Sequence, residues 1–223
     1  RSSAASDVYK RQVSDTPPRL LEEIYGKPFQ AAIQESDLLG IMPCYCTVNG
    51  EPVSASYGLL TKLLRDEMGF QGLCISDYGA VGNTHGSQHV GETLEDAGLL
   101  CLKAGMDMEL PNPSGFGEKF LEKFRTGKAD ISALNRAVLR VLTAKFRMGL
   151  FEHPFSLQGE ELKGVFSQKT DREVSLQSAK ESLVLLKNNG VLPIGSDVKK
   201  IAVIGPHADC ARKFFGGYTH MCM

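Results

Sequence analysis

The run Gly72-Leu73-Cys74-Ile75-Ser76-Asp77-Tyr78-Gly79 is the stretch that decides the fold class of this chain. Residues 73–76 have the short, non-alternating pattern that is typical of a strand buried in a parallel sheet. Asp77 is the first charged residue after them and therefore stands at the strand's carboxyl end, where α/β enzymes bind ligands. Because Asp is also a common helix cap or turn residue, the flanking sequence has to decide its role.

Two more short apolar runs, at residues 39–43 and 106–110, lie at nearly equal distances before and after residues 73–76. One strand, one loop, one helix and a short return fill that spacing in a parallel βα repeat. The repeat predicts the α/β class and suggests either the later part of a (β/α)8 barrel or a doubly wound sheet. Three such units cannot close a barrel, so we expect the chain to be part of a larger protein.

The segments between and after these strands carry the apolar periodicity and the capping residues of helices. Leu59, Leu60, Leu63 and Leu64, for example, form one apolar stripe. The glycine-rich stretch 78–91 is expected to be a loop. The expected helices are 29–37, 57–68, 92–103, 117–125, 131–148 and 171–180.

The sequence divides into four regions by composition. They are a polar, aperiodic leader, disordered or foreign to the fold, at 1–16; the βα repeat, as the C-terminal part of a barrel or of a doubly wound sheet, at 17–150; a linker and connecting helix at 151–180; and the start of a second α/β domain at 181–223. Residues 182–187 and 200–205 have the pattern of buried strands of that second domain. We expect the chain to stop inside it.

The composition is that of an ordinary globular protein. The 223 residues are 42% hydrophobic and 23% charged, and the formal net charge is -1. A nearly neutral chain gives no reason to expect nucleic acid or an anionic membrane as a partner. No apolar run reaches the length of a bilayer span, and no signal peptide is visible at the N-terminus.

The cysteines lie at positions 44, 46, 74, 101, 210 and 222. They form no CxxC pair, and the spacing of Cys44 and Cys46 places both side chains on one face of an expected strand. We interpret the cysteines as buried free thiols rather than as zinc ligands or disulfides, which favours a mildly reducing compartment such as the cytoplasm. His85 and His89 show no metal-ligand spacing, so neither a metal nor another cofactor is predicted.

Several segments, taken in order along the chain, are similar to glycoside hydrolase family 3, the β-glucosidase and β-xylosidase family. The most specific is Ser76-Asp77-Tyr78-Gly79-Ala80-Val81, which resembles the family's nucleophile motif. The other matching segments are 27–33, 41–52, 64–72, 104–111, 184–193 and 201–209. The resemblance implies a partial (β/α)8 TIM-type barrel followed by the beginning of an α/β sandwich domain.

The resemblance also implies hydrolysis of terminal non-reducing β-linked sugars, from a β-glucoside or a β-xyloside, by a retaining mechanism with two carboxyl groups. Asp77 matches the nucleophile. The family places its acid/base in the second domain, past the end of this chain, and its sugar-gripping groups in the first half of the barrel. We therefore expect the 223 residues alone to be inactive. The full-length protein would take oligosaccharides or other β-glycosides and could form homo-oligomers.

Four residues close to Asp77 in this scheme are candidates for supporting roles. Tyr45 either donates a hydrogen bond to Asp77 or packs at the barrel rim. Tyr78 either borders the sugar as an aromatic platform or packs against the protein. Asp107 and Glu109 lie two apart on one strand and face the same side. We interpret Asp107 as a structural carboxylate paired with Arg or Lys, and Glu109 as a substrate contact.

The chain departs from the family at Cys44 and Cys46, where Ser and Asn usually flank the tyrosine, so two thiols replace polar groups there. The Tyr78-Gly79 pair favours the xylosidase side of the family. A non-catalytic carbohydrate-binding relative is a second interpretation, which the intact Asp77 opposes. A nucleotide- or phosphate-binding α/β module beginning at 201–205 is a third, but the G-x-G-x-x-G pattern that opens a dinucleotide site is missing.

Overall fold

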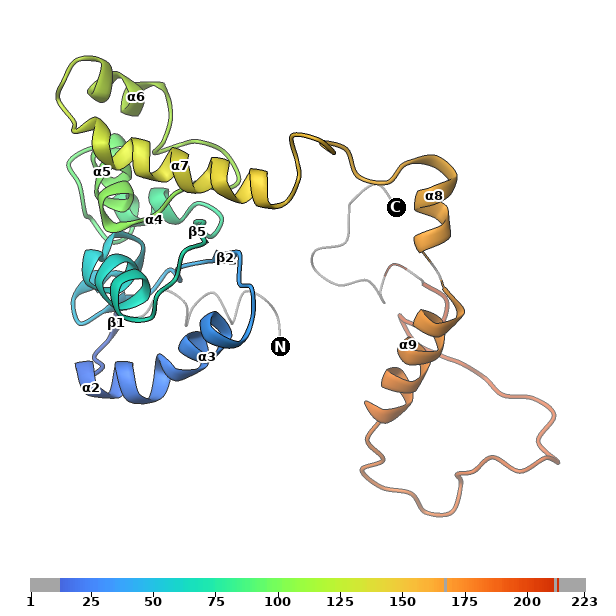
Figure 1. The fold of residues 1–223 in the computed structure, drawn as a ribbon. Helices are drawn as coiled ribbons and strands as arrows, with labels where there is room; N and C mark the ends of the chain where they lie inside the picture. The colour runs from blue at the N-terminus through green and yellow to red at the C-terminus, as the bar shows by residue number, and fades with distance from the viewer. Residues whose placement is uncertain (1–12, 167, 211, 213–223) are drawn as a thin grey trace. The chain divides into compact units, whose positions relative to one another are not determined.

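The computed structural model describes residues 13–166, 168–210 and 212. These residues fall into two compact units, which divide between Pro154 and Phe155. Every described strand and helices α2 to α7 belong to the first unit, whereas α8 and α9 belong to the second (Figure 1).

Three parallel strand segments lie side by side in the first unit. β2 (Gly40–Ile41) pairs with β5 (Leu73–Cys74), and Ile75 forms an isolated parallel bridge with Met108. The three predicted strands are therefore confirmed as parallel neighbours, and the α/β class is confirmed with them. The regular ladder is shorter than predicted, because only two residues in each of β2 and β5 pair. The described residues form no closed barrel.

A second sheet, of three strands, joins residues 13–14 to the loop after β2. β1 (Val13–Ser14) pairs in parallel with β3 (Thr47–Val48), which pairs antiparallel with β4 (Glu51–Pro52). Asn49 and Gly50 connect β3 to β4 with positive φ angles of 50° and 81°, as a two-residue hairpin turn requires.

The predicted leader at 1–16 extends too far, because its last residues are part of this three-stranded sheet. Ser14 pairs with β3, and Thr16 is buried. The Asn49 side chain accepts a hydrogen bond from the Thr16 amide (2.8 Å) and donates one to the Thr16 carbonyl (2.7 Å). A polar segment held by strand pairing and side-chain hydrogen bonds has no apolar periodicity, so the sequence pattern does not reveal it. Residues 1–12 lie outside the described part of the chain.

Helices make up most of the first unit, and those that were predicted lie close to their expected positions (Figure 1). η1 and η3 are π-helices, with i to i+5 hydrogen bonds such as that from the Met68 amide to the Leu63 carbonyl, and η2 is a 3-10 turn. The helices are α2 (Pro18–Leu20), η1 (Leu21–Tyr25), α3 (Lys27–Glu35), η2 (Val53–Ala55), η3 (Gly58–Glu67), α4 (Ala80–Gly86), α5 (Leu94–Ala104), α6 (Glu118–Arg125) and α7 (Ile131–Arg147).

The glycine-rich stretch 78–91 contains α4, so the prediction of a loop there is wrong. Gly79 has a φ of 70°, and this left-handed conformation turns the chain from the end of the strand into the helix. Ala80, Val81 and Thr84 are buried, so tertiary packing stabilises a helix whose own propensity is low. The glycines of α4 lower that propensity and hide its apolar face from the sequence pattern.

The core of the first unit lies between α4, α5, α6 and α7. Phe120 stacks on Phe116 at a centroid distance of 4.9 Å and meets Phe124 edge-on at 5.0 Å. Two clusters of buried side chains lie here, Val81, Ala97, Cys101 and Met106 in the first and Leu102, Phe120, Ala133 and Ala137 in the second, and a third cluster of Leu60, Cys74 and Ala104 joins η3, β5 and α5. These contacts fix α5 against α4 on one side and against α6 and α7 on the other.

The described residues of the second unit form two helices, α8 (Gly159–Val165) and α9 (Lys169–Glu181). α9 confirms the helix predicted at 171–180, and α8 adds a helix to the segment predicted as a linker. None of the described helices in either unit is long and apolar enough to cross a membrane.

The buried strands predicted at 182–187 and 200–205 are absent from the described residues of the second unit. Neither segment pairs with another, and their apolar side chains face solvent: Leu186 is 92% exposed and Ile204 is 90% exposed. A strand needs a neighbour for its backbone hydrogen bonds, and no described segment of this unit supplies one. The apolar pattern therefore indicates a preference for buried strands, but the two segments form no strand in this structure.

Candidate active site

The end of β5 positions Asp77, the predicted nucleophile. Ser76 is buried, and its amide donates to the carbonyl of Met108 at 2.9 Å. The Ser76 hydroxyl oxygen accepts a hydrogen bond from the amide of Leu110 at 2.8 Å. Asp77 therefore emerges, half-buried, where two parallel strand segments end beside each other. This is the position that the sequence predicts for it.

The turn after β5 orients the Asp77 side chain. Its Oδ1 accepts a hydrogen bond from the amide of Tyr78 at 2.7 Å, and its backbone carbonyl accepts one from Ala80 at 3.1 Å. A hydrogen bond to an ionised carboxylate is stronger than one between neutral groups, so the Tyr78 amide holds one carboxylate oxygen in place.

Tyr45 meets the same turn. Its hydroxyl donates to the backbone carbonyl of Tyr78 at 2.5 Å, one residue beyond the Asp77 acceptor that the sequence suggested. The Tyr78 ring itself is 62% exposed. The structure thus brings Tyr45, Asp77 and Tyr78 together: the Tyr78 amide contacts the Asp77 side chain, and the Tyr78 carbonyl contacts the Tyr45 side chain.

Gln88 fixes the segment that carries Tyr45. Its Nε2 donates to the carbonyl of Tyr45 at 2.9 Å and to the Thr47 hydroxyl at 3.1 Å. Gln88 follows α4 and lies far from Tyr45 in sequence, so it joins the loop before β3 to the stretch after the nucleophile. Sequence reasoning missed it, because a lone glutamine in a glycine-rich stretch belongs to no motif.

Glu109, predicted as a substrate contact, is engaged by its own loop. Its Oε1 accepts hydrogen bonds from the Ser114 hydroxyl (2.5 Å) and the Gly115 amide (3.1 Å), and its Oε2 accepts one from the Phe116 amide (2.8 Å). These three donors use most of the acceptor capacity of a carboxylate. The structure therefore gives Glu109 the role of shaping the 114–116 loop, and its contact with substrate stays a prediction.

Asp107 lies beneath the site as a buried, doubly paired carboxylate. Its Oδ2 accepts from Arg65 Nη2 at 2.8 Å and its Oδ1 from Arg140 Nη1 at 2.9 Å, and its side chain is 0% exposed. The amide of Cys74, within β5, also donates to Oδ2 at 2.9 Å. The interpretation of Asp107 as a structural carboxylate paired with basic residues is confirmed.

Arg65 extends this network to two loops. It donates to the carbonyls of Gly72 at 3.0 Å and Gly105 at 3.3 Å, just before the two strand segments that end at the site. Burial lowers the pKa of the Arg65 guanidinium, and the neighbouring Asp107 opposes that shift. Sequence reasoning missed Arg65, because an arginine next to the leucines of an amphipathic helix usually faces solvent.

The two histidines after Asp77 lie apart from any group of metal-binding side chains among the described residues. His85 Nδ1 lies 3.2 Å from the carbonyl of Gly91, and His89 is exposed with a φ of 55°. Within residues 13–166, 168–210 and 212, no group of three or more His, Cys, Asp or Glu side chains could hold a metal ion.

The thiols divide into two kinds. Cys74 and Cys101 are buried as predicted, and burial raises the pKa of each to about 12. Cys44, by contrast, is exposed, and Cys46 is only partly buried. The prediction of buried thiols is wrong for this pair, because residues 42–46 leave the sheet after β2 and form no strand.

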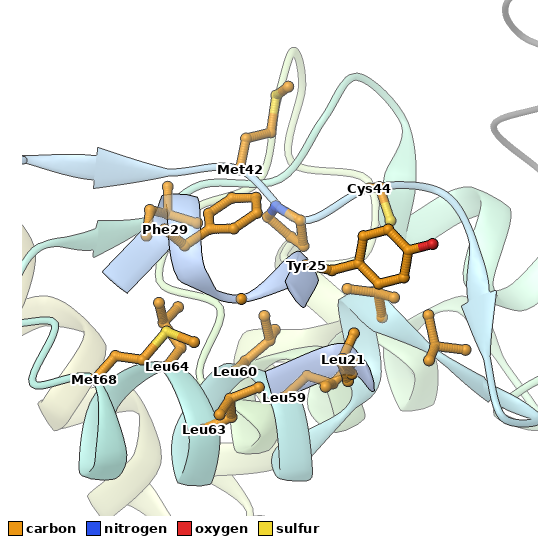
Figure 2. A pocket seen from close by; sticks show the side chains of 15 residues that line it. Leu21, Tyr25, Phe29, Met42, Cys44, Leu59, Leu60, Leu63, Leu64 and Met68 are labelled. Atoms are coloured by element: carbon orange, nitrogen blue, oxygen red, sulfur yellow. The ribbon is translucent and has the colours of Figure 1, made fainter. Parts of the chain in front are cut away.

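An apolar pocket of about 250 Å³ lies away from this turn (Figure 2). Leu21 and Tyr25 of η1, Phe29 of α3 and the leucines of η3 line it, together with the residues that follow β2. Neither Asp77 nor Tyr78 belongs to its wall. A lining so poor in hydrogen-bonding groups does not suit a sugar, so this pocket is not the candidate active site.

The phosphate-binding alternative loses its structural basis. Residues 206–209 form a turn, whereas a dinucleotide site needs a helix N-terminus directly after its strand. No strand precedes the turn among the described residues of the second unit.

Known proteins resemble this chain over most of its length. A sequence model of the glycosyl hydrolase family 3 N-terminal domain matches residues 2–144. A β-glucosidase of Rhizobium radiobacter is 37% identical over 206 residues, which cover 92% of this chain and 23% of the relative. A β-xylosidase of Formosa agariphila is 34% identical over 221 residues, which cover 92% of this chain and 30% of the relative.

Solved structures give the same result. A β-glucosidase involved in saponin metabolism from intestinal bacteria superposes with a TM-score of 0.72 at 33% identity, over 82% of this chain and 24% of its own. A β-glucosidase from Listeria innocua gives a TM-score of 0.69 at 29% identity, over 82% of this chain and 25% of its own. The chain thus spans less than a third of the length of these relatives. It belongs to glycosyl hydrolase family 3, also called glycoside hydrolase family 3.

Proposed function

We propose that the intact protein containing this chain is a retaining exo-β-glycosidase that removes terminal β-linked glucose or xylose. The observation that carries the proposal is the position of Asp77, a half-buried carboxylate at the carboxyl end of β5 with one oxygen held by the Tyr78 amide. Relatives named β-glucosidase and β-xylosidase support this class of substrate. A Listeria innocua β-glucosidase variant crystallised with laminaribiose is a further precedent for an oligosaccharide.

In the proposed mechanism, Asp77 attacks the anomeric carbon of the sugar. Because the Tyr78 amide occupies Oδ1, we assign the attack to Oδ2. A second carboxyl group, about 5–5.5 Å away in retaining enzymes, protonates the leaving oxygen and then activates the water that releases the sugar. We assign no described carboxylate to that second role, because Asp107 is fully paired and Glu109 is bound to its own loop.

The two tyrosines support the nucleophile in different ways. The exposed ring of Tyr78 offers an aromatic face to the apolar side of a sugar ring. Tyr45 donates to the carbonyl of the same residue, whose amide donates to Asp77, so it holds the backbone of the residue that contacts the nucleophile. Substrate and nucleophile would thus share one ordered turn.

Trapping the covalent intermediate tests this proposal. We expect a 2-deoxy-2-fluoro-β-glucoside or -xyloside with an activated leaving group to label the intact protein. Peptide mapping should place the label on Asp77, and Asp77→Asn should remain unlabelled. A label on Glu109 would overturn the assignment. Binding of the sugar without turnover or label would instead indicate the non-catalytic carbohydrate-binding relative.

A further inference from the structure

We propose that Cys44 and Cys46 form a dithiol site for a soft, thiophilic centre, of which the trivalent arsenicals are the representative class. The two residues are separated only by Tyr45, and burial, followed by the interaction with the neighbouring Cys44 side chain, raises the pKa of Cys46. Cys44 is exposed and Cys46 is partly buried, so a reagent can enter at the first sulfur and close onto the second. Soft centres select thiolate pairs over the oxygen and nitrogen groups of the surrounding surface.

The other described thiols do not compete for such a ligand. Cys74 and Cys101 are fully buried in separate core clusters, so a reagent in solvent does not reach them. Cys210 belongs to the second unit and has no described cysteine beside it in sequence. Within the described residues, only Cys44 and Cys46 combine access with a second sulfur two positions away.

The chemistry needs no oxidant. With an arsenoxide such as phenylarsine oxide, the arsenic–oxygen bonds break and two arsenic–sulfur bonds form. Both thiol protons leave with the oxygen as one molecule of water, and arsenic stays trivalent. The product is a ring that contains the arsenic atom, both side chains and the backbone of Tyr45. Two sulfurs hold the centre as a chelate, so a small dithiol should remove it and a small monothiol should not.

Closing this ring would reach the proposed active site through Tyr45. The Tyr45 hydroxyl donates to the carbonyl of Tyr78, and the Tyr78 amide donates to Asp77. The Tyr45 carbonyl is held by Gln88. A chelate across residues 44–46 fixes the backbone on both sides of Tyr45, and we expect this to weaken the contact between Tyr45 and Tyr78. Inhibition by this route rests on the proposed glycosidase function, whereas binding of the arsenical does not.

The binding test uses the intact protein and phenylarsine oxide. Intact mass should show one arsenical per chain, bound with loss of one water, and peptide mapping should find it on Cys44 and Cys46 together. The adduct should be lost in C44S and in C46S and retained in C210S. Excess 2,3-dimercaptopropanol should release it, and excess 2-mercaptoethanol should not. An adduct at any other pair, or one retained in both single variants, would overturn the site.

The activity test is separate. With an aryl β-glycoside, the chelated protein should lose roughly tenfold in kcat, about the effect of one lost hydrogen bond near the reacting group. The dithiol should restore the rate, and C46S should resist the loss. Full activity in a stoichiometrically chelated protein would overturn the coupling to Tyr45. If the proposed glycosidase function were wrong, no rate would be measurable with or without the arsenical, yet the mapped adduct would still form.

Discussion

Asp77 depends on contacts from residues that are distant in sequence. The Tyr78 amide holds Oδ1, the Tyr45 hydroxyl holds the Tyr78 carbonyl, and Gln88 holds Tyr45 in turn. The Tyr45 and Gln88 contacts are made by side-chain donors, so substitution can remove each of them without opening a cavity in the core. The site can therefore be dissected one bond at a time.

Removing the Tyr45 hydroxyl should slow turnover without unfolding the protein. In Tyr45→Phe, we expect kcat of the intact protein to fall about 3- to 10-fold, the rate equivalent of one hydrogen bond of about 0.5–1.5 kcal/mol. The melting temperature should stay close to that of the wild type. Tyr25→Phe is the matched control, because Tyr25 lines the apolar pocket. Equal effects of the two substitutions would contradict the role of Tyr45.

Breaking the Asp107 pairs should act on stability. Asp107→Asn leaves Arg65 and Arg140 without a buried counter-charge, and loss of one partner from a buried pair costs about 3–5 kcal/mol. The control is Asp37→Asn, which breaks an exposed pair with Arg147 and should cost less than about 1 kcal/mol. Denaturant unfolding of the intact proteins measures both. A smaller effect at Asp107 than at Asp37 would be inconsistent with the network.

At this scale, sequence reasoning found the carboxylates and missed their partners. Asp77 was recognisable because it directly follows a strand, and Asp107 because an acidic residue in a buried strand needs a counter-charge. Arg65, Arg140 and Gln88 come from other elements, and only the tertiary fold brings them to the site. The acceptor of the Tyr45 hydroxyl also depends on the exact course of the turn, which no pattern encodes.

At the scale of elements, α5 and α6 are joined through the first turn of α5. Thr93 caps α5: its hydroxyl oxygen accepts from the Asp96 amide at 3.2 Å, and its hydroxyl donates to Asp96 Oδ2 at 2.7 Å. Lys123 of α6 reaches Asp96 Oδ1 at 2.7 Å. Asp96 thus serves both as a cap partner and as an ion-pair partner between helices.

This double role predicts a pH dependence. The hydrogen bond from Lys123, followed by that from Thr93, lowers the pKa of Asp96 in the folded protein. A lowered folded-state pKa stabilises the protein above the unfolded-state value of about 3.9, and that stabilisation is lost as pH falls through the lowered value. The stability difference between wild type and Asp96→Asn should therefore be present at neutral pH and shrink in acid. Unfolding curves at several pH values measure it, and a difference that grows in acid would contradict it.

The helices differ in how well the sequence revealed them. α5, α6 and α7 carry regular apolar faces and were predicted close to their true bounds. α4 was missed, because its glycines suggest a loop and its stability comes from burial of Ala80, Val81 and Thr84. β1 was missed for a related reason, since two polar-flanked residues paired with a distant strand leave no periodic signal.

At the scale of the whole molecule, the chain carries one proposed catalytic carboxylate and no assigned acid/base. The 223 residues alone should therefore hydrolyse an aryl β-glycoside at least about 10²–10⁴-fold more slowly than the intact protein, the usual contribution of a general acid/base. Matched preparations of the two, assayed with β-glucoside and β-xyloside substrates, measure the ratio. A native-like rate from the 223 residues would show that the site is complete within them.

The segments 182–187 and 200–205 are the largest difference between sequence and structure at this scale. Their composition is that of buried strands, yet Leu186 and Ile204 lie in solvent. We propose that both segments become strands of a second α/β domain in the intact protein. An apolar pattern can predict that a segment prefers to be a strand, but the strand forms only when a neighbouring strand is present to pair with it.

Asp107 also determines how far the strand bearing Asp77 can slide along its neighbour. Its amide donates to the Cys74 carbonyl at 2.8 Å, and its carboxylate accepts from the Cys74 amide. Asp107 therefore hydrogen-bonds to both backbone groups of Cys74. Strands this short have few ladder bonds to define their register, and a slip of one position would turn every side chain to the opposite face. Asp107 therefore fixes the register of β5 and, with it, the position of the nucleophile along the strand. Anyone grafting the Asp77 strand into another protein would have to move Asp107 and its two arginines with it.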